Sequence, residues 1–311
     1  MAEVRTDVRA RDARISDRKA ARLGRLGRFV QEHPASSFFV LAYVLSWLAW
    51  LLPTLGFGET IALAGLYAGG FGPAAAAVII TWCSGESVLK WARSIFHWRV
   101  QPKWYAVALG LPILLMGLAS IAFAIFGLQI DLSLLPGRLP MYLPMLALTA
   151  LAQGGNEEPG WRGFALPRLE ERHVPVVTTL ILGAIWAFWH LPVLAANPAE
   201  TQHGMSLIAL MPIVLVTAIN IISLSFVYTW IYNSTGSVLL CILLHASANT
   251  ANGLLIPMPD AALQGDLYQT VLLVTTGINL VVAAALVGLT RGRLGFDAIQ
   301  KGEINAGQCR S

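Results

Sequence analysis

Apolar residues gather into eight long runs along the chain, and short polar segments separate them. The runs cover residues 36–56, 60–82, 104–126, 141–158, 174–195, 205–231, 237–256 and 268–289. A helix that crosses a bilayer needs roughly 20 mostly apolar residues, and most of the runs reach that length. The pattern therefore predicts an all-α fold, a polytopic membrane helical bundle of about eight transmembrane helices.

Two of these runs are irregular. The fourth is plainly apolar only over residues 141–152. The sixth is longer than one span requires, which predicts a tilted helix or a bend at Pro212. A short neutral segment, residues 232–236, separates the sixth run from the seventh.

Composition supports the membrane class. Hydrophobic residues make up 56% of the chain and charged residues 12%, whereas about 25% of residues are charged in soluble domains. The three cysteines, Cys83, Cys241 and Cys309, are scattered, so the sequence favours neither a disulfide framework nor a cysteine zinc site. The basic residues cluster at the ends of the runs, as membrane topology requires, and so we expect no nucleic-acid partner.

The loops alternate between basic and non-basic. Lys and Arg gather in residues 1–32, 83–103 and 159–173 and again after residue 290, while the other long loops carry mainly Asp and Glu. The positive-inside rule then predicts an integral membrane protein with both termini in the cytoplasm.

This arrangement divides the chain into three parts. We expect a basic cytoplasmic tail over residues 1–35, with a short surface helix around residues 12–29. Its basic stretch is too long for a cleaved signal peptide. A transmembrane domain over residues 36–290 and a cytoplasmic tail over residues 291–311 complete the division.

Four ionisable residues lie in or beside the apolar runs, where each costs roughly 2.5–3.5 kcal/mol. They are Glu157 and Glu158 at the inner end of the fourth run, His190 in the fifth and His245 in the seventh. Arg162 follows Glu158 by one helical turn and can pair with it, which leaves Glu157 free for another partner. Pro159 can break the helix here, and an ion pair that only anchors a helix end is the structural alternative.

The histidines add a second polar group. Asn249 follows His245 by four residues and shares its helix face, so the two could form a site or simply join two helices. His190 alone could be an ordinary core histidine. Taken together, the polar residues suit amide hydrolysis, which needs a base to activate water and a donor for the oxyanion. A metal site that generates hydroxide would serve the same chemistry.

These residues form three motifs in order. Glu157, Glu158 and Arg162 fit EExxxR, His190 follows Trp186 where FxxxH has phenylalanine, and His245 with Asn249 fits HxxxN. Over about residues 141–255 the chain resembles the CPBP intramembrane proteases, which include the CAAX prenyl endopeptidases and the bacterial Abi proteins linked to bacteriocin immunity. Trp186 still provides an aromatic surface at the phenylalanine position of the FxxxH motif.

The resemblance implies a helical intramembrane core with a cavity open to one side. It also implies that Glu157 activates water with help from His190. Glu158 and Arg162 would form a structural pair that positions Glu157. His245 and Asn249 would form the oxyanion or metal side. A divalent ion such as zinc would have Glu157, His190 and His245 as ligands, whereas a metal-free glutamate mechanism is the alternative. HExxH is absent from the sequence.

We therefore expect an intramembrane endopeptidase of the metallo- or glutamate-dependent type, acting on a membrane-associated or lipidated protein or peptide among membrane lipids. The alternative is a non-catalytic immunity scaffold or a transporter. A transporter favours symmetric broken helices in both halves, whereas the polar residues here lie in the second half.

The predicted depths of these residues in the membrane do not agree with a single site. Helical rise puts His190 about 24 Å and His245 about 12 Å from the cytoplasmic ends of their runs, with Glu157 shallower still. The groups meet only if the fourth and fifth runs tilt or if residues 159–173 enter the membrane.

Overall fold

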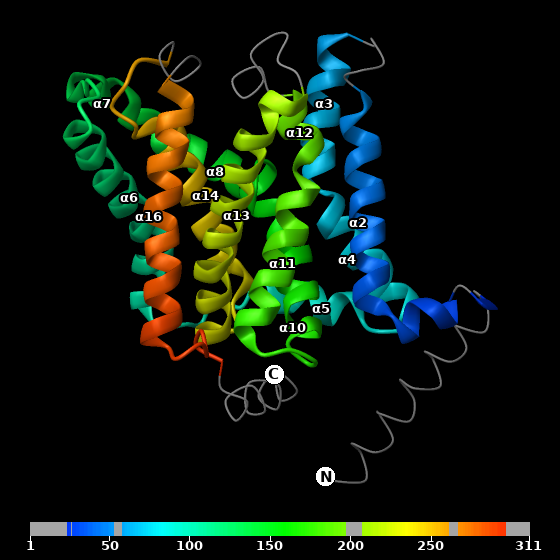
Figure 1. Ribbon diagram of the computed structural model, residues 1–311. Helices are drawn as coiled ribbons and strands as arrows, with labels where there is room; N and C mark the ends of the chain where they lie inside the picture. Colours follow the sequence, from blue (N-terminus) through cyan, green and yellow to red (C-terminus); the bar gives the residue numbers. More distant parts are fainter. Residues whose placement is uncertain (1–23, 26, 53–57, 197–206, 261–266, 297–311) are drawn as a thin grey trace.

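A computed structural model describes residues 24–25, 27–52, 58–196, 207–260 and 267–296 (Figure 1). Every regular element among them is helical, which confirms the all-α prediction. The longer helices are α2 (Pro34–Trp50), α3 (Glu59–Gly70), α4 (Gly72–Cys83), α5 (Val88–Ile95), α6 (Pro102–Ile125), α8 (Tyr142–Ala152), α11 (Pro175–Trp189), α13 (Leu207–Thr235), α14 (Val238–Leu254) and α16 (Leu267–Leu289). Most of the tail helix expected around residues 12–29 lies outside the described residues.

The helices occupy the eight predicted runs. By length and composition, four helices of the described chain can cross a membrane: α6, α13, α16 and a broken run over Leu132–Leu169. The bent pair α3 and α4 makes a fifth candidate, and α2, α11 and α14 are shorter apolar helices. The chain is therefore an all-α polytopic membrane bundle.

The bundle is arranged around α13 and α14. Helix α13 packs against α11, α14 and α16, while α14 also packs against α6 and α8. Helix α2 covers α3 and α4 at the other side of the molecule (Figure 1). Large apolar side chains such as Leu114 and Val281 point outward and are 59% and 68% exposed. This outer surface suits contact with lipid chains.

Glycines allow α2, α3 and α4 to approach closely. A Cβ on Gly69 would lie 2.1 Å from Trp50 Nε1, and one on Gly72 would lie 2.0 Å from Ser46 Oγ. The two glycines flank the 50° bend between α3 and α4. Small residues thus let these helices pack closely, as is common between helices in a membrane.

The fourth run extends further than the sequence predicted. After α8 the chain continues as a 3₁₀ turn (Gly155–Glu157), α9 (Glu158–Gly160), a π-helical turn (Trp161–Ala165) and α10 (Leu166–Leu169). Before α8 lie the 3₁₀ turns Leu132–Leu134 and Leu139–Met141 and the short helix α7 (Leu135–Arg138). The prediction that the run ends near residue 158 was wrong because its prolines begin new helical turns instead of ending the span.

This extension removes the difficulty of depth. Glu157 and Glu158 lie inside a run that continues to Leu169, not at its end. Counted from Leu169, helical rise places Glu157 about 18 Å along the run, between the values for His245 and His190.

Two further boundaries differ from prediction. Helix α11 ends at Trp189 and α12 (Leu191–Ala196) follows, so His190 occupies the junction. Helix α13 continues to Thr235 and contains Pro212, so most of the predicted loop at 232–236 is helical. It ends where Gly236 adopts a φ of +66°, and Ser237 then caps α14 by accepting a hydrogen bond from the Leu240 amide.

Candidate active site

A tight turn leads from α8 to the two glutamates. Gly154 has a φ of +132°, and its amide donates to Asn156 Oδ1 at 2.9 Å. The preceding carbonyl, Gln153 O, accepts from Asn249 Nδ2 at 2.9 Å. A Cβ on Gly154 would lie 2.4 Å from His245 Nε2. Glycine is therefore required here both for the backbone conformation and for the close approach to His245.

Glu158 forms the centre of a buried ionic group. Arg162 Nη1 donates to both of its carboxylate oxygens at 3.1 Å, and the Glu158 and Arg162 side chains are fully buried. His245 Nδ1 lies 2.8 Å from Glu158 Oε1. The expected pair is thus present, and Glu158 also fixes the imidazole of His245.

Arg162 has further partners that offset its burial. Its Nη2 donates to Ser225 Oγ at 3.0 Å. The guanidinium carbon lies 4.5 Å from the ring centre of Trp186 and 4.4 Å from that of Tyr228. A buried charge needs pairing and hydrogen bonds of this kind, and the ring faces add cation–π attraction.

Glu157 has different partners from its neighbour. Its Oε2 accepts from the indole of Trp186 at 2.8 Å and from that of Trp161 at 3.3 Å. Among the described residues, nothing donates to Oε1. The indoles therefore hold one carboxylate oxygen and leave the other available.

His190 is held by the same tryptophan. Its Nδ1 lies 2.8 Å from the backbone carbonyl of Trp186. A carbonyl oxygen only accepts, so Nδ1 carries the proton and a neutral imidazole keeps its lone pair on Nε2. The His190 and His245 rings pack against Trp186 with centroid distances of 5.7 and 5.6 Å.

The structure thus brings together five of the six predicted residues around Trp186: Glu157, Glu158, Arg162, His190 and His245. Asn249 lies at the edge of this cluster. It is exposed and is connected to the turn before Glu157 through Gln153 O.

Sequence reasoning missed several of the supporting groups. Trp186 was regarded as an aromatic surface, yet its indole N–H binds Glu157, which a phenylalanine cannot do. Trp161, Tyr228 and Ser225 were not considered. A buried indole N–H usually needs an acceptor, so the tryptophans beside acidic residues carried a usable signal, whereas Ser225 carried none.

The candidate metal ligands are a separate question from the hydrogen-bonded cluster. Among the described residues, no group of three or more His, Cys, Asp and Glu side chains is placed to hold a metal ion. The candidate ligands Glu157, His190 and His245 are all described. In this conformation they do not fit a divalent ion.

A largely apolar pocket lies between α6, α13, α14 and α16, with about 530 Å³ of empty space including its open side. Tyr228 and Leu244 line it, but none of the six candidate residues does. Tyr228 also contacts His245, at a centroid distance of 5.6 Å, and so lies between the pocket and the cluster.

Comparison with known proteins identifies the segment that holds this cluster. Residues 139–251 match the family model described as type II CAAX prenyl endopeptidase Rce1-like. The chain is also similar to CAAX prenyl protease 2 of Methanococcus maripaludis, with 24% identity over 155 residues. That match covers 47% of this chain and 49% of the relative, so the chain spans about half the length of the curated protein. All six candidate residues fall within residues 139–251, so the segment that is similar to the CAAX prenyl endopeptidases is the one that carries the cluster.

Proposed function

We propose that the protein is an intramembrane endopeptidase that hydrolyses a peptide bond in a membrane-associated or lipidated protein. One observation carries the proposal. The buried side chain of Glu157 has one oxygen held by two indoles, and no described residue donates to the other. Trp186, which donates to Glu157, also holds His190 through its backbone carbonyl. This arrangement suits a general base better than a structural ion pair, because the structural pair is already formed by Glu158 and Arg162.

The reaction would begin at Glu157. Its free oxygen removes a proton from a water molecule while the water oxygen attacks the carbonyl carbon of the substrate. When the tetrahedral intermediate collapses, the C–N bond breaks and the leaving amine takes a proton, which His190 can relay through Nε2. General acid–base catalysis of this kind contributes about 10²–10⁴-fold.

His245 and Asn249 would bind the developing oxyanion. Glu158 accepts from His245 on the Nδ1 side, so that Nε2 faces the turn at Gly154 and donates to the oxyanion when the ring carries both protons. Asn249 lies one helical turn further along α14 and has a second amide hydrogen beside the one donated to Gln153 O. Removal of one oxyanion donor costs roughly 10²–10³-fold in other hydrolases.

We derive these steps from side chains alone, because the candidate metal ligands do not fit an ion in this conformation. A divalent ion such as zinc bound by Glu157, His190 and His245 would supply a more acidic water. Chelation distinguishes the two mechanisms. The side-chain mechanism predicts unchanged turnover with a chelator, whereas lost turnover that zinc restores would require the metal.

The substrate class follows from the position of the cluster. A lipid anchor would hold a peptide at the bilayer beside a site built from membrane helices. The curated relative is named for CAAX prenyl proteolysis, and we propose a prenylated C-terminal peptide as the first substrate to test.

The experiment uses the full chain in lipid vesicles. A farnesylated peptide with a CAAX-type end and its unprenylated twin are incubated with the protein, and the products are identified by mass spectrometry. Cleavage of the farnesylated peptide at one bond supports the proposal. If neither peptide nor a panel of membrane proteins is cut, the non-catalytic scaffold or transporter is favoured instead.

A further inference from the structure

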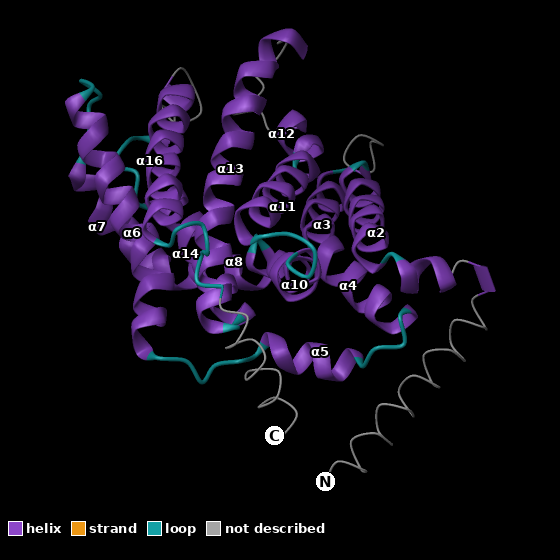
Figure 2. Ribbon diagram, turned by 60° about the horizontal axis from the view of Figure 1, so that its bottom comes forward, coloured by secondary structure: helices purple, strands orange, loops and turns teal. Residues whose placement is uncertain are grey.

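Helix α5 runs across one end of the bundle, at a steep angle to the long helices (Figures 1 and 2). It has two distinct faces. Trp91 and Ile95 are turned toward the protein, and Ile95 is buried. Leu89, Arg93 and Phe96 follow one another at i, i+4 and i+7 on the outer face, where Leu89 is 60% and Phe96 66% exposed.

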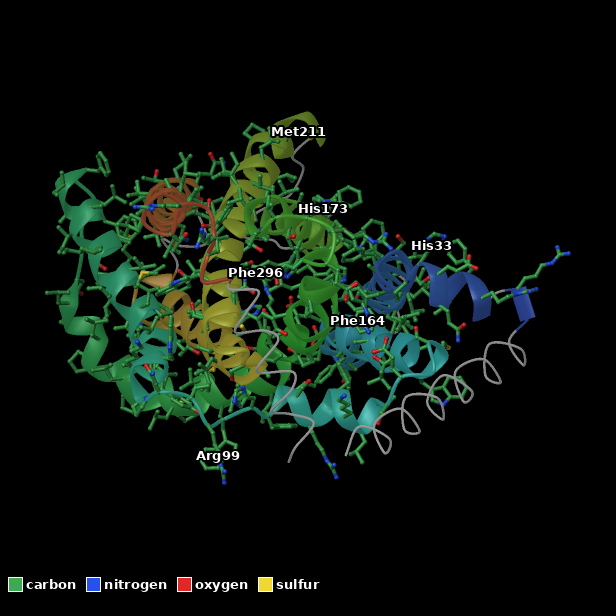
Figure 3. The ribbon with its side chains drawn as sticks, turned by 90° about the horizontal axis from the view of Figure 1, so that it is seen from below. His33, Arg99, Phe164, His173, Met211 and Phe296 are labelled. Carbon is green, nitrogen blue, oxygen red and sulfur yellow. The ribbon has the colours of Figure 1, made fainter. Side chains whose placement is uncertain are left out.

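The same combination of aromatic and basic side chains continues after α5. Trp98 is 61% exposed, and the guanidinium carbon of Arg99 lies 5.2 Å from its ring centre. Lys103 Nζ lies 5.6 Å from the ring centre of Trp104. Figure 3, which views the molecule from this end, shows Arg99 at the rim and directed away from the helices.

Three of the four cations in residues 88–103 have no ion-pair partner among the described residues. They are Arg93, Arg99 and Lys103. Glu86, which precedes α5, is bound to Arg168 instead, with 2.7 Å between Oε1 and Nη2. The surface is therefore both cationic and apolar, the combination that interfacial helices use on anionic membranes.

The inner face of this segment contacts both halves of the candidate active site. Trp91 Nε1 donates to Gly163 O at 3.2 Å, directly after Arg162 in the π-helical turn. Ser237 Oγ, which caps the helix that carries His245, donates to His97 O at 2.6 Å. A shift of α5 would consequently reach Arg162 and His245 together.

We propose that residues 88–103 form a binding surface for anionic phospholipid headgroups. Leu89, Phe96 and Trp98 would enter the acyl boundary while Arg93, Arg99 and Lys103 bind lipid phosphates. Lipid bound here would hold α5 in place and so position the π-helical turn and the start of α14. The binding surface stands without the proposed function, whereas its effect on turnover rests on it.

The binding experiment uses the purified full chain in detergent, titrated with phosphatidylglycerol or phosphatidylcholine and followed by native mass spectrometry. Each cation near an anionic surface is worth roughly a five-fold gain in affinity. The double variant Arg93→Gln/Arg99→Gln should therefore lose roughly 25-fold in phosphatidylglycerol affinity. The matched control is Arg291→Gln/Arg293→Gln, which removes two exposed cations from the cytoplasmic end predicted by loop charge and should change the affinity little.

Three outcomes would overturn the proposal that residues 88–103 bind anionic phospholipids. The wild type could show no preference for phosphatidylglycerol, or both double variants could lose affinity equally, which would indicate general charge. Competition by inorganic phosphate or by a soluble acidic peptide would indicate a free anion or a protein as the ligand instead of a membrane surface.

The coupling to the site has its own variant. Trp91→Phe keeps an aromatic ring at this position but removes the hydrogen bond to Gly163 O. We expect it to bind phosphatidylglycerol normally but to lose the rise in turnover that this lipid gives the wild type in vesicles. If Trp91→Phe keeps that rise, the coupling is wrong. If the wild type cuts nothing in any membrane, the proposed function fails, while the binding experiment still decides the surface.

Discussion

The adjacent side chains of Glu157 and Glu158 have entirely different surroundings. Glu158 is held by a guanidinium and an imidazole, whereas Glu157 is held by two neutral indoles. The difference follows from the helical geometry, because neighbouring residues point about 100° apart. One carboxylate is thereby committed to structure and the other is left with an open oxygen.

Trp186 offers a direct test of how Glu157 is held. Trp186→Phe keeps an aromatic face over Arg162 but removes the donor to Glu157 Oε2. Because a hydrogen bond to a charged group contributes about 1.5–3 kcal/mol, we expect kcat to fall roughly ten- to a hundred-fold with little change in KM. Trp50→Phe is the control, since it loses a similar indole bond, to Leu66 O, and Trp50 does not donate to Glu157. Equal kcat values for the two variants would show that Trp186 does not position Glu157.

Gly154 is the second residue that can be tested alone. In Gly154→Ala the new methyl group would meet His245 Nε2, and the positive φ would be strained. A misplacement of about 1 Å can cost roughly 10²-fold in rate, and we expect a loss of at least that size in kcat/KM. Gly110→Ala, whose Cβ would meet no atom within 4 Å, should leave the rate unchanged. An active Gly154→Ala protein would contradict the close approach of the turn to His245.

At the scale of the elements, the partners of the Glu158–Arg162 pair connect the broken fourth run to the rest of the bundle, because Glu158 binds His245 of α14 and Arg162 binds Ser225 of α13. Arg162→Leu leaves Glu158 without its guanidinium partner, which costs about 3–5 kcal/mol for a buried pair. In Glu158→Gln/Arg162→Leu no carboxylate remains to be left unpaired, so part of the thermal stability in detergent should return. If the single and double variants melt at the same temperature, the pair does not stabilise the fold as described.

Elements marked by a clear local sequence pattern were predicted correctly, and those without one were not. Long apolar runs located the spans, and the i, i+4 spacing located the pair of Glu158 and Arg162. The end of the fourth run was misplaced because Pro159 was expected to be able to break the helix, while in the structure short helical turns continue through it and through Pro167. Contacts between distant segments, such as Trp186 with Glu157 or Ser225 with Arg162, have no periodic signal and required the structure.

At the scale of the whole molecule, charge separates the two ends of the bundle. Arg93, Arg99 and Arg291 belong to the loops predicted to be cytoplasmic, whereas Glu59 and Asp260 belong to the loops predicted on the other side. By the positive-inside rule, we expect the basic end to face the cytoplasm. In a background without Cys83 and Cys309, we expect Asp260→Cys to react with an impermeant thiol reagent in intact cells and Arg291→Cys to react only after lysis. The reverse pattern would invert the topology.

Catalysis by Glu157 is the claim on which the whole account depends, and one measurement tests it most directly. Wild type, Glu157→Gln and Glu86→Gln are purified, matched for melting temperature, and assayed in vesicles with the farnesylated peptide. Glutamine keeps the size of the side chain and its bond to the indoles but cannot take a proton, whereas Glu86 lies outside the cluster and is bound to Arg168. We predict that Glu157→Gln loses at least about 10²-fold in kcat while Glu86→Gln remains near the wild type. A folded Glu157→Gln protein that cleaves the peptide at the wild-type rate would contradict the account.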